Sequence, residues 1–188
     1  MNRLALLLLV GCSGTIDGGA SGDDDVDVDA AAPTSAAVAR AREWVAVQLP
    51  YCQAPNHERD YDADCASTCT RPDNPDWDPY RSDCSGLVSW AWELPPPGRV
   101  TGTFAPFNTE VSHVIDAIDL SPGDAVNNDH HMMLFAEWVT PGAEAVFIDE
   151  PGCSSSQPYA REFTATVTLD GSTIVVKSHG TFTAIRHD

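Results

Sequence analysis

The chain has 188 residues, of which 43% are hydrophobic, so it is long enough to bury the core of one domain. Its 28 acidic residues outnumber 10 Lys and Arg residues, which gives a formal net charge of −18. A protein that binds nucleic acid needs a basic surface to neutralise the phosphates. The composition therefore speaks against nucleic acid as a partner.

The first twelve residues have the features of a bacterial export signal. Arg3 supplies a positive charge, and the apolar run at 4–10 is too short to span a bilayer. Leu-Val-Gly-Cys, ending at Cys12, resembles a lipobox, which implies that Cys12 is lipidated and anchors the protein to a membrane. Ser13 follows, and by the same resemblance implies the cell envelope, at the outer membrane facing the periplasm, or outside the cell. An ordinary secretory signal is the alternative.

Residues 13–34 are rich in Asp, Gly, Ser and Ala and contain no aromatic residue. Such a segment cannot bury enough apolar surface to fold, so we expect a disordered acidic tether. The folded domain is then expected over residues 35–188, with a Cys-rich insertion at 52–82.

Six cysteines occur, and export would place them where disulfides persist. If Cys12 carries lipid, five remain, and at least one thiol stays unpaired. A zinc site is the alternative to disulfides, although the spacings match no standard zinc pattern. Elimination leaves Cys84 as the unpaired cysteine. The disulfide candidates are Cys52, Cys65, Cys69 and Cys153.

The first half of the expected domain has helical patterns. Residues 35–49 place apolar side chains on one face, and Pro50 ends the pattern. Residues 86–94 are apolar on nearly all sides, which predicts a buried helix that ends at the Pro-Pro-Pro-Gly run at 95–98. Residues 108–118 have the pattern of a further short helix.

The second half changes to strand-like patterns after the Ser-Pro-Gly-Asp turn at 121–124. Asp-Gly at 170–171 is a hairpin signal between two of the runs. Helices followed by an antiparallel meander predict an α+β fold. The expected strands are 131–139, 145–149, 163–169, 173–176 and 181–185.

Cys84 lies at the start of the helix expected at 86–94, where unpaired N–H groups and the helix dipole favour a negative charge. The same N–H groups can hold an oxyanion, and Gly86 would let a substrate approach closely. His131 opens a strand and is a candidate base, while Asp149 and Glu150 end the next strand and are candidates to orient it. An ordinary buried cysteine before a helix would have the same surroundings.

The stretch Asp83-Cys84-Ser85-Gly86-Leu87-Val88 resembles the nucleophile motif of the NlpC family of cell-wall cysteine peptidases. Leu-Pro-Tyr at 49–51, Pro-Gly-Asp at 122–124 and the His-led strand at 131–135 resemble three further motifs in the order of that family. The resemblance implies a papain-like α+β fold, with N-terminal helices packed on an antiparallel sheet or partial barrel. It also implies hydrolysis of peptidoglycan stem peptides or related amides, without a cofactor or metal, by what we expect to be a monomer.

By this resemblance Cys84 is the nucleophile, His131 the general base, and Tyr51 helps to hold the oxyanion or substrate. The third catalytic residue is Asp149 in the NlpC register, or Glu150 by analogy with the related CHAP amidases, and we slightly favour Glu150. The implied substrate-binding residues are Asp83, Ser85 and Tyr80.

Three departures from the family pattern occur. Cys52-Gln53 stands where glycines usually follow Pro-Tyr, so Tyr80 is an alternative to Tyr51. Met133 stands where a small residue is usual and would narrow the cleft, and the third catalytic residue is acidic. A non-catalytic envelope lipoprotein and an amidase or acyltransferase on other substrates are therefore the alternative functions.

Two other features suggest binding chemistry, each with a simpler explanation. Residues 60–64 contain three alternating Asp residues, as at the start of a Ca²⁺ loop, but Cys65 replaces the required Gly and Arg71 the required Glu. Tryptophans could line a glycan groove, although two of them are better explained as core. These tryptophans are Trp77, Trp90 and Trp92, of which Trp90 and Trp92 are the expected core residues.

Overall fold

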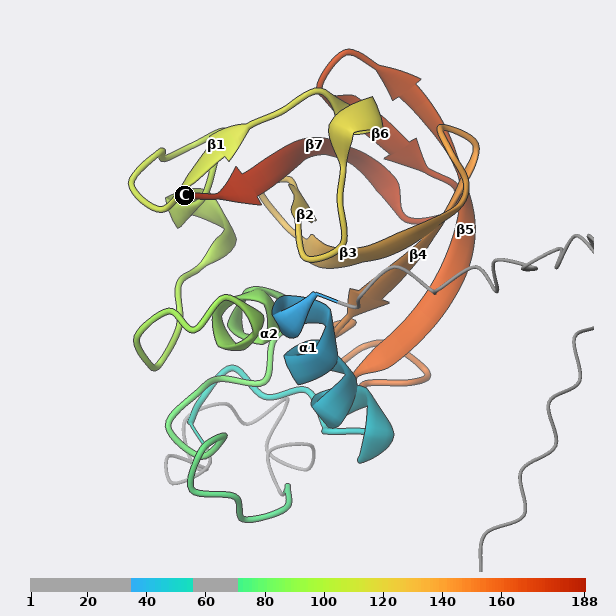
Figure 1. Ribbon diagram of the computed structural model, residues 1–188. Coiled ribbons are helices and arrows are strands. Elements are labelled where there is room, and N and C mark those ends of the chain that lie inside the picture. The colour runs from blue at the N-terminus through green and yellow to red at the C-terminus, as the bar shows by residue number, and fades with distance from the viewer. Residues whose placement is uncertain (1–34, 56–70) are drawn as a thin grey trace, which may run out of the picture. The chain divides into compact units, whose positions relative to one another are not determined.

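The computed structural model describes residues 35–55 and 71–188. Two α-helices come first and seven β-strands follow (Figure 1). The helices are α1 (Ala36–Ala46) and α2 (Cys84–Ala91), with short 3-10 turns at Thr101–Thr103 and Ala117–Asp119. The strands are β1 (Ser112–Val114), β2 (Ala125–Asn127), β3 (Met132–Thr140), β4 (Glu144–Asp149), β5 (Arg161–Asp170), β6 (Thr173–Val176) and β7 (Gly180–His187).

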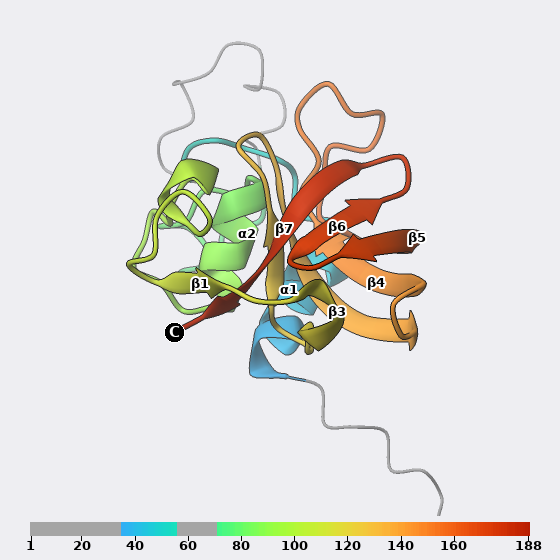
Figure 2. The same cartoon turned by 90° about the horizontal axis from the view of Figure 1, so that it is seen from above.

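Six strands form a closed antiparallel barrel in the order β2-β3-β4-β5-β6-β7. Closure depends on β7, which pairs with β6 through residues 180–183 and with β2 through residues 183–185. β1 adds to β7 outside the ring. Figures 1 and 2 show the ring of strands with both helices against one side of it.

Both helices are short and capped at the N-terminus. The hydroxyl of Ser35 accepts the backbone N–H of Val38, and Asp83 does the same for α2. α1 ends where Gln48 adopts a positive φ of 49°, two residues before Pro50. The helices pack against each other and contact β3.

Two hydrophobic cores share the barrel wall. One lies inside the barrel, because all six barrel strands contribute side chains to it, including Phe135, Phe147 and Phe182. The other lies between the wall and the helices and contains Trp44 and Leu87. Alternate residues of β3 enter the two cores, as the period of two of a β-strand requires. The helix-side residues are Met132, Leu134 and Ala136, and the barrel residues are Met133 and Phe135.

The prediction of a papain-like α+β fold, with N-terminal helices packed on a sheet or partial barrel, is wrong. Most of the regular secondary structure of the described residues belongs to a closed six-stranded barrel, and helix is limited there to α1, α2 and the two 3-10 turns. Local patterns indicated the hairpins correctly. They carried no signal for the pairing of β2 with β7, which are about 60 residues apart and close the ring.

The helix expected at 108–118 is also wrong, since this segment contains β1 and part of a 3-10 turn. Ser112 pairs with His187 and Val114 with Ile185. Pairing with a strand from the end of the chain overrides a weak local helical preference, as tertiary contacts often do.

Several expectations fall on residues 1–34 and 56–70, which lie outside the described residues. They concern the signal segment, Cys12, the tether, Cys65, Cys69 and the Asp residues at 60–64. Within the described ranges, neither helix has the length and apolar character that crossing a bilayer requires. The same ranges contain no group of three or more His, Cys, Asp or Glu side chains arranged to hold a metal ion.

Candidate functional site

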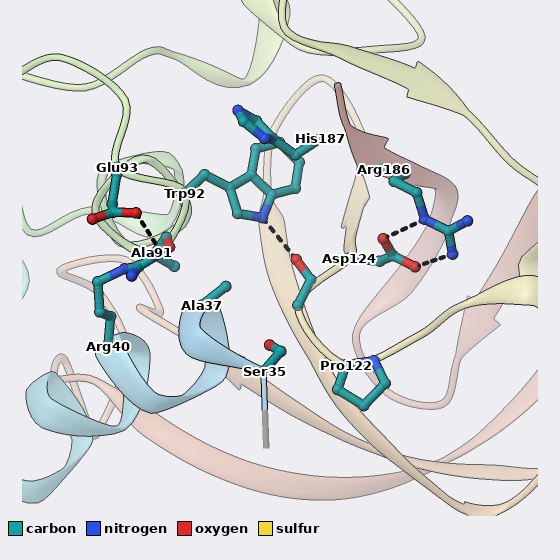
Figure 3. A pocket seen from close by; sticks show the side chains of 11 residues that line it. Ser35, Ala37, Arg40, Ala91, Trp92, Glu93, Pro122, Asp124, Arg186 and His187 are labelled. Atoms are coloured by element: carbon teal, nitrogen blue, oxygen red, sulfur yellow. Dashed lines mark hydrogen bonds and ion pairs between the residues drawn. The ribbon is translucent and has the colours of Figure 1, made fainter. Parts of the chain in front are cut away.

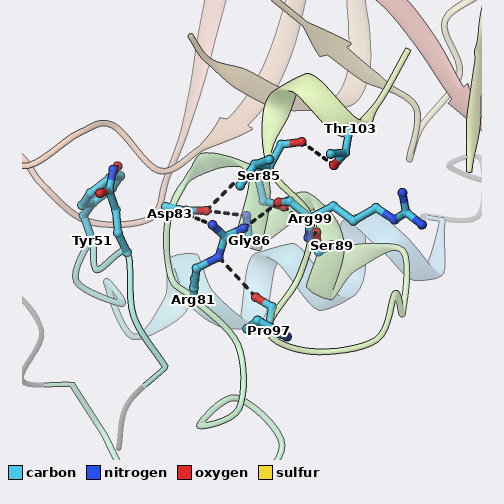
Figure 4. A network of polar contacts seen from close by, with 11 residues as sticks. Tyr51, Arg81, Asp83, Ser85, Gly86, Ser89, Pro97, Arg99 and Thr103 are labelled. Carbon is cyan, nitrogen blue, oxygen red and sulfur yellow. Dashed lines mark hydrogen bonds and ion pairs between the residues drawn. The ribbon is translucent and has the colours of Figure 1, made fainter. Parts of the chain in front are cut away.

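α2 gives Cys84 a defined position, because Cys84 is the first residue of the helix and is half-buried. The carboxylate of Asp83 accepts the backbone N–H of Gly86 at 2.7 Å and the hydroxyl of Ser85 at 3.1 Å (Figure 4). Arg81 lies 3.4 Å from the same carboxylate. Burial raises the pKa of Asp83, although Arg81 and the hydrogen bonds of the cap oppose the rise.

Gly86 is required by packing, and it does not line the cavity beside Cys84. A Cβ atom at this position would lie 2.1 Å from the carbonyl oxygen of Arg81, closer than atoms can approach. The expectation that Gly86 admits a substrate is therefore replaced by a structural role. The glycine lets the chain turn tightly before α2.

His131 precedes β3 and contacts Cys84. The side-chain oxygen of Asn128 accepts the backbone N–H of His131 at 2.7 Å, which fixes the turn before the strand. The imidazole interacts with the side chain of Cys84, and its Nε2 lies 3.1 Å from Asp149 Oδ2. Phe182 lies edge-on to the imidazole, with the ring centroids 6.3 Å apart. Since Nε2 faces Asp149, Nδ1 is the nitrogen left for the sulfur.

Asp149, and not the favoured Glu150, orients His131. Asp149 follows Phe147 at a spacing of two, so it lies on the inner face of β4 at the end of the barrel, and Glu150 belongs to the opposite face with Ile148. The carboxylate of Asp149 is almost fully buried and also accepts two hydrogen bonds from Arg161. The structure therefore brings together Cys84, His131 and Asp149.

The protonation states of these groups follow from their contacts. Burial alone would lower the pKa of His131, but hydrogen bonds and charge interactions with Asp149 and Cys84 outweigh it and raise this pKa to about 9. Burial likewise opposes ionisation of Asp149, but the hydrogen bonds from His131 and Arg161 outweigh it and lower the pKa of Asp149. At neutral pH the imidazolium of His131 therefore faces the carboxylate of Asp149.

Glu150 is fully buried, and neither of its side-chain oxygens has a hydrogen-bond partner. Burial is the main reason that its pKa lies well above the usual range, and electrostatic interactions with Asp149, Asp83 and Cys84 add to the rise. The nearby charge of Arg71 opposes it. Glu150 is therefore held in its neutral form beside an ionised neighbour.

A cavity of about 370 Å³ opens beside Cys84. Tyr51 lines it, whereas Tyr80 is buried elsewhere and donates its hydroxyl to the carbonyl of Leu94 at 2.6 Å. Tyr51 Oη accepts a hydrogen bond from Gln53 Nε2 at 2.8 Å. The remaining lining residues are Gln53, Arg81, Asp83, Ser85, Val100, Thr101 and His130.

Met133 and the tryptophans do not line this cavity. Met133 is fully buried inside the barrel, so it does not narrow the cleft. Trp90 stacks on Trp44 with the ring centroids 6.3 Å apart, and Trp92 packs edge-on against Phe104. Trp77 is partly buried and packs against the helix-side core. None of them forms a glycan groove at this site.

The described cysteines divide into two kinds. Cys52 and Cys153, both disulfide candidates from the sequence, are disulfide-bonded. Cys84 has a free thiol. The backbone of Cys52 pairs with Ser82, which fixes the segment that carries Tyr51 next to the start of α2.

Sequence reasoning missed Arg161, Arg81, Gln53 and the exposed His130. Arg161 lies directly opposite Asp149 in the register of β4 and β5. The alternating pattern of the two runs indicated strands but not which residues face one another. A hairpin register counted from the loop between them would have been needed to find Arg161.

A second cavity, of about 330 Å³, has a lining that shares no residue with the Cys84 cavity (Figure 3). It contains another buried carboxylate with an arginine partner, Asp124 with Arg186, at 2.9 and 2.7 Å. Neither a histidine nor a cysteine takes part in this ion pair, so Asp124 and Arg186 do not form a set of groups like that at Cys84.

Comparison of the chain with protein-family models, with curated proteins and with solved structures finds no match.

Proposed function

We propose that this chain is a cysteine hydrolase that cleaves amide bonds, and that its substrates are peptidoglycan stem peptides. The observation that carries the proposal is the contact of Cys84 with His131, whose other ring nitrogen lies 3.1 Å from the buried Asp149. A thiol, an imidazole and an orienting carboxylate in this order are the groups that nucleophilic catalysis by cysteine needs.

The first half of the reaction forms a thioester. His131 already holds the proton as an imidazolium, so the sulfur of Cys84 attacks the carbonyl carbon of the amide as a thiolate, and a tetrahedral oxyanion forms. The imidazolium then protonates the leaving nitrogen, and the C–N bond breaks. The carboxylate of Asp149 holds the ring in place and stabilises its positive charge in both steps.

Two groups are available to hold the oxyanion. The carboxylate of Asp83 accepts the backbone N–H groups of Ser85 and Gly86. The backbone N–H of Cys84 does not bind this cap, so it is the donor of the first helical turn that can face an oxyanion. Tyr51 lies in the wall of the same cavity. A backbone donor at a helix N-terminus is well suited to a developing negative charge.

The second half of the reaction is hydrolysis of the thioester. Neutral His131 accepts a proton from water, the hydroxide attacks the acyl carbon, and the thiolate of Cys84 leaves. His131 is about one quarter exposed, which gives water a path to the ring. The products are a carboxylic acid and an amine.

The choice of substrate rests on the cavity and on short motifs. The cavity is lined mostly by polar and charged side chains, among them Arg81, Gln53 and His130, which suits a short polar peptide. The likeness of residues 83–88, 122–124 and 131–135 to NlpC motifs and the signal-like start of the chain support a substrate in the cell wall.

The experiment is a comparison of the purified protein with Cys84→Ala on soluble peptidoglycan fragments. New amino groups should appear with the native protein and not with the variant. A Val139→Ala variant, changed at an exposed side chain of β3 that does not line the cavity, is the control and should retain activity.

Equal release of amino groups by the native protein and Cys84→Ala would contradict the proposal and favour a non-catalytic envelope protein. Release of a transfer product when a small amine is added would identify an acyltransferase, since the same thioester then passes to an amine rather than to water.

A further inference from the structure

We propose that Arg161 is a positioning residue that assigns the negative charge at the end of β4 to Asp149 and holds this carboxylate against His131. The role rests on the proposed cysteine chemistry of the site. Arg161 does not line the cavity beside Cys84, so it acts through Asp149 and not on the substrate.

The geometry fixes the two side chains relative to each other. Arg161 is the directly opposite partner of Asp149 in the pairing of β4 and β5. Its Nε lies 2.8 Å from Asp149 Oδ1, and its Nη2 lies 3.3 Å from Oδ2. A planar guanidinium that binds both oxygens fixes the rotation of the carboxylate, which a single donor cannot do.

Because the carboxylate of Asp149 is fixed, the imidazole of His131 can approach it from one direction only. Oδ2 accepts from Arg161 and lies 3.1 Å from His131 Nε2, so the imidazole completes the set of partners. The guanidinium carbon of Arg161 is itself 5.3 Å from the centroid of Phe163, which packs against the barrel core. A chain of contacts therefore runs from the barrel interior to the imidazole.

Two adjacent buried acids cannot both be charged at low cost. The cationic partner of Asp149 is at hydrogen-bond distance, whereas Glu150 has no hydrogen-bond partner and meets the charges of Asp149, Asp83, Cys84 and Arg71 only at longer range. Asp149 is consequently the acid that ionises. Among the groups around Arg161, Tyr159 and Glu150 also carry titratable side chains.

The variant Arg161→Gln distinguishes a positioning role of Arg161 from a purely electrostatic effect of its positive charge. Removing a positive charge near an undisturbed Asp149 would only favour the imidazolium and leave the thiolate intact. Loss of positioning has the opposite result, because Asp149 takes up a proton more easily and rotates away from His131. The reaction of Cys84 with iodoacetamide, followed against pH, reports the difference without any peptide substrate.

The expected result for Arg161→Gln is an alkylation rate at pH 6 that is lower by on the order of 10-fold to 100-fold. The acid limb of the profile of alkylation rate against pH should move to higher pH by about 1 unit. Arg161→Lys keeps the charge but loses the two-point contact, and should give an intermediate rate. Hydrolysis should lose kcat with little change in KM.

Arg186→Gln is the matched control, because it removes an arginine that binds both oxygens of Asp124 on another part of the barrel (Figure 3). It should leave the alkylation profile unchanged. A folded Arg161→Gln with the native profile would overturn the proposal. If Arg161→Gln fails to fold, a native profile for Arg161→Lys would overturn it equally, and a slowed one supports it.

The outcome is separable from that of the proposed function. If the native protein releases no amino groups from peptidoglycan, the substrate assignment fails, but the alkylation profiles still decide whether Arg161 positions the Cys84, His131 and Asp149 set.

Discussion

Asp149 and Glu150 are neighbours of the same chemical type that have opposite environments. One is ionised between His131 and Arg161, and the other is neutral and has no hydrogen-bond partner. The difference follows from the alternation of side chains along β4, which turns Asp149 toward the end of the barrel. Analogy with a family of enzymes favoured Glu150, and the strand geometry selects Asp149.

Asp149→Asn is expected to lower the pKa of His131 from about 9, because the carboxylate stabilises the imidazolium. In the proposed reaction the imidazolium protonates the leaving group, so its loss defines the alkaline limb of kcat/KM. This limb should move to lower pH in the variant, and the maximal rate should fall on the order of 100-fold. The measurement is hydrolysis against pH, with Asp124→Asn as a control that should retain the native limb.

Glu150→Gln is expected to stabilise the protein at neutral pH. The folded pKa of Glu150 lies above its unfolded value of about 4.3, so the folded state holds its proton more tightly. The native stability from this group is present below that value and is lost as pH rises toward the folded pKa, by up to about 1.4 kcal/mol per unit.

The check is the free energy of unfolding by urea at pH 5, 6, 7 and 8. The Glu150→Gln curve should be flatter than the native curve and should lie above it at pH 7. Glu144→Gln, at the other end of the same strand, serves as the control. Parallel curves for the native protein and Glu150→Gln would contradict the neutral state of Glu150.

At the scale of elements, α2 is the part of the fold that positions Cys84, the proposed nucleophile. Its first turn is held by the Asp83 cap and by the close approach of Gly86 to the carbonyl of Arg81. Its other face packs Leu87 and Val88 into the helix-side core. The position of the sulfur therefore depends on contacts at the N-terminus and along the buried face of a helix of eight residues.

Gly86→Ala is expected to destabilise the protein by about 1–3 kcal/mol, because the added Cβ must displace the Arg81 carbonyl or α2. The displacement should also slow alkylation of Cys84. Gly102→Ala is the control, since a Cβ there meets no atom within 4 Å, and its effect should stay within about 0.5 kcal/mol. Denaturant unfolding and iodoacetamide rates measure the two effects, and equal behaviour of the variants would refute the packing role.

At the scale of the whole molecule, the barrel supports the site through its interior. Phe147 lies two residues before Asp149 and packs edge-on against Phe135, with the ring centroids 5.9 Å apart. Phe163 lies two residues after Arg161 and packs on Phe147. The aromatic core and the polar groups at the barrel end thus follow one another along the same inner face.

Phe147→Ala is expected to cost about 3–5 kcal/mol, since it leaves a cavity in the interior of the barrel. Val139→Ala, on an exposed part of β3, should change the stability by about 0.5 kcal/mol or less. Thermal or urea unfolding tests both. A small effect of Phe147→Ala would show that the barrel interior is not the main source of stability.

The sequence was informative where the signal was local. Apolar periodicity, proline stops, turn signals and alternation indicated α1, α2 and the strands from β3 to β7, and counting cysteines indicated the free thiol of Cys84. Contacts between residues far apart in the chain could not be predicted from the sequence. Closure of the barrel by β7, the pairing of β1 and the register that sets Arg161 opposite Asp149 each join residues whose relation no local pattern records.

The first part of β3 has no solvent-facing side, because Met132 and Leu134 enter one core and Met133 and Phe135 the other. Amide deuterium exchange there requires both cores to open together, so these N–H groups should be among the slowest to exchange in the protein. His131 immediately precedes this segment. Partial unfolding should therefore release the backbone that follows His131 late, after the exposed turns have already opened.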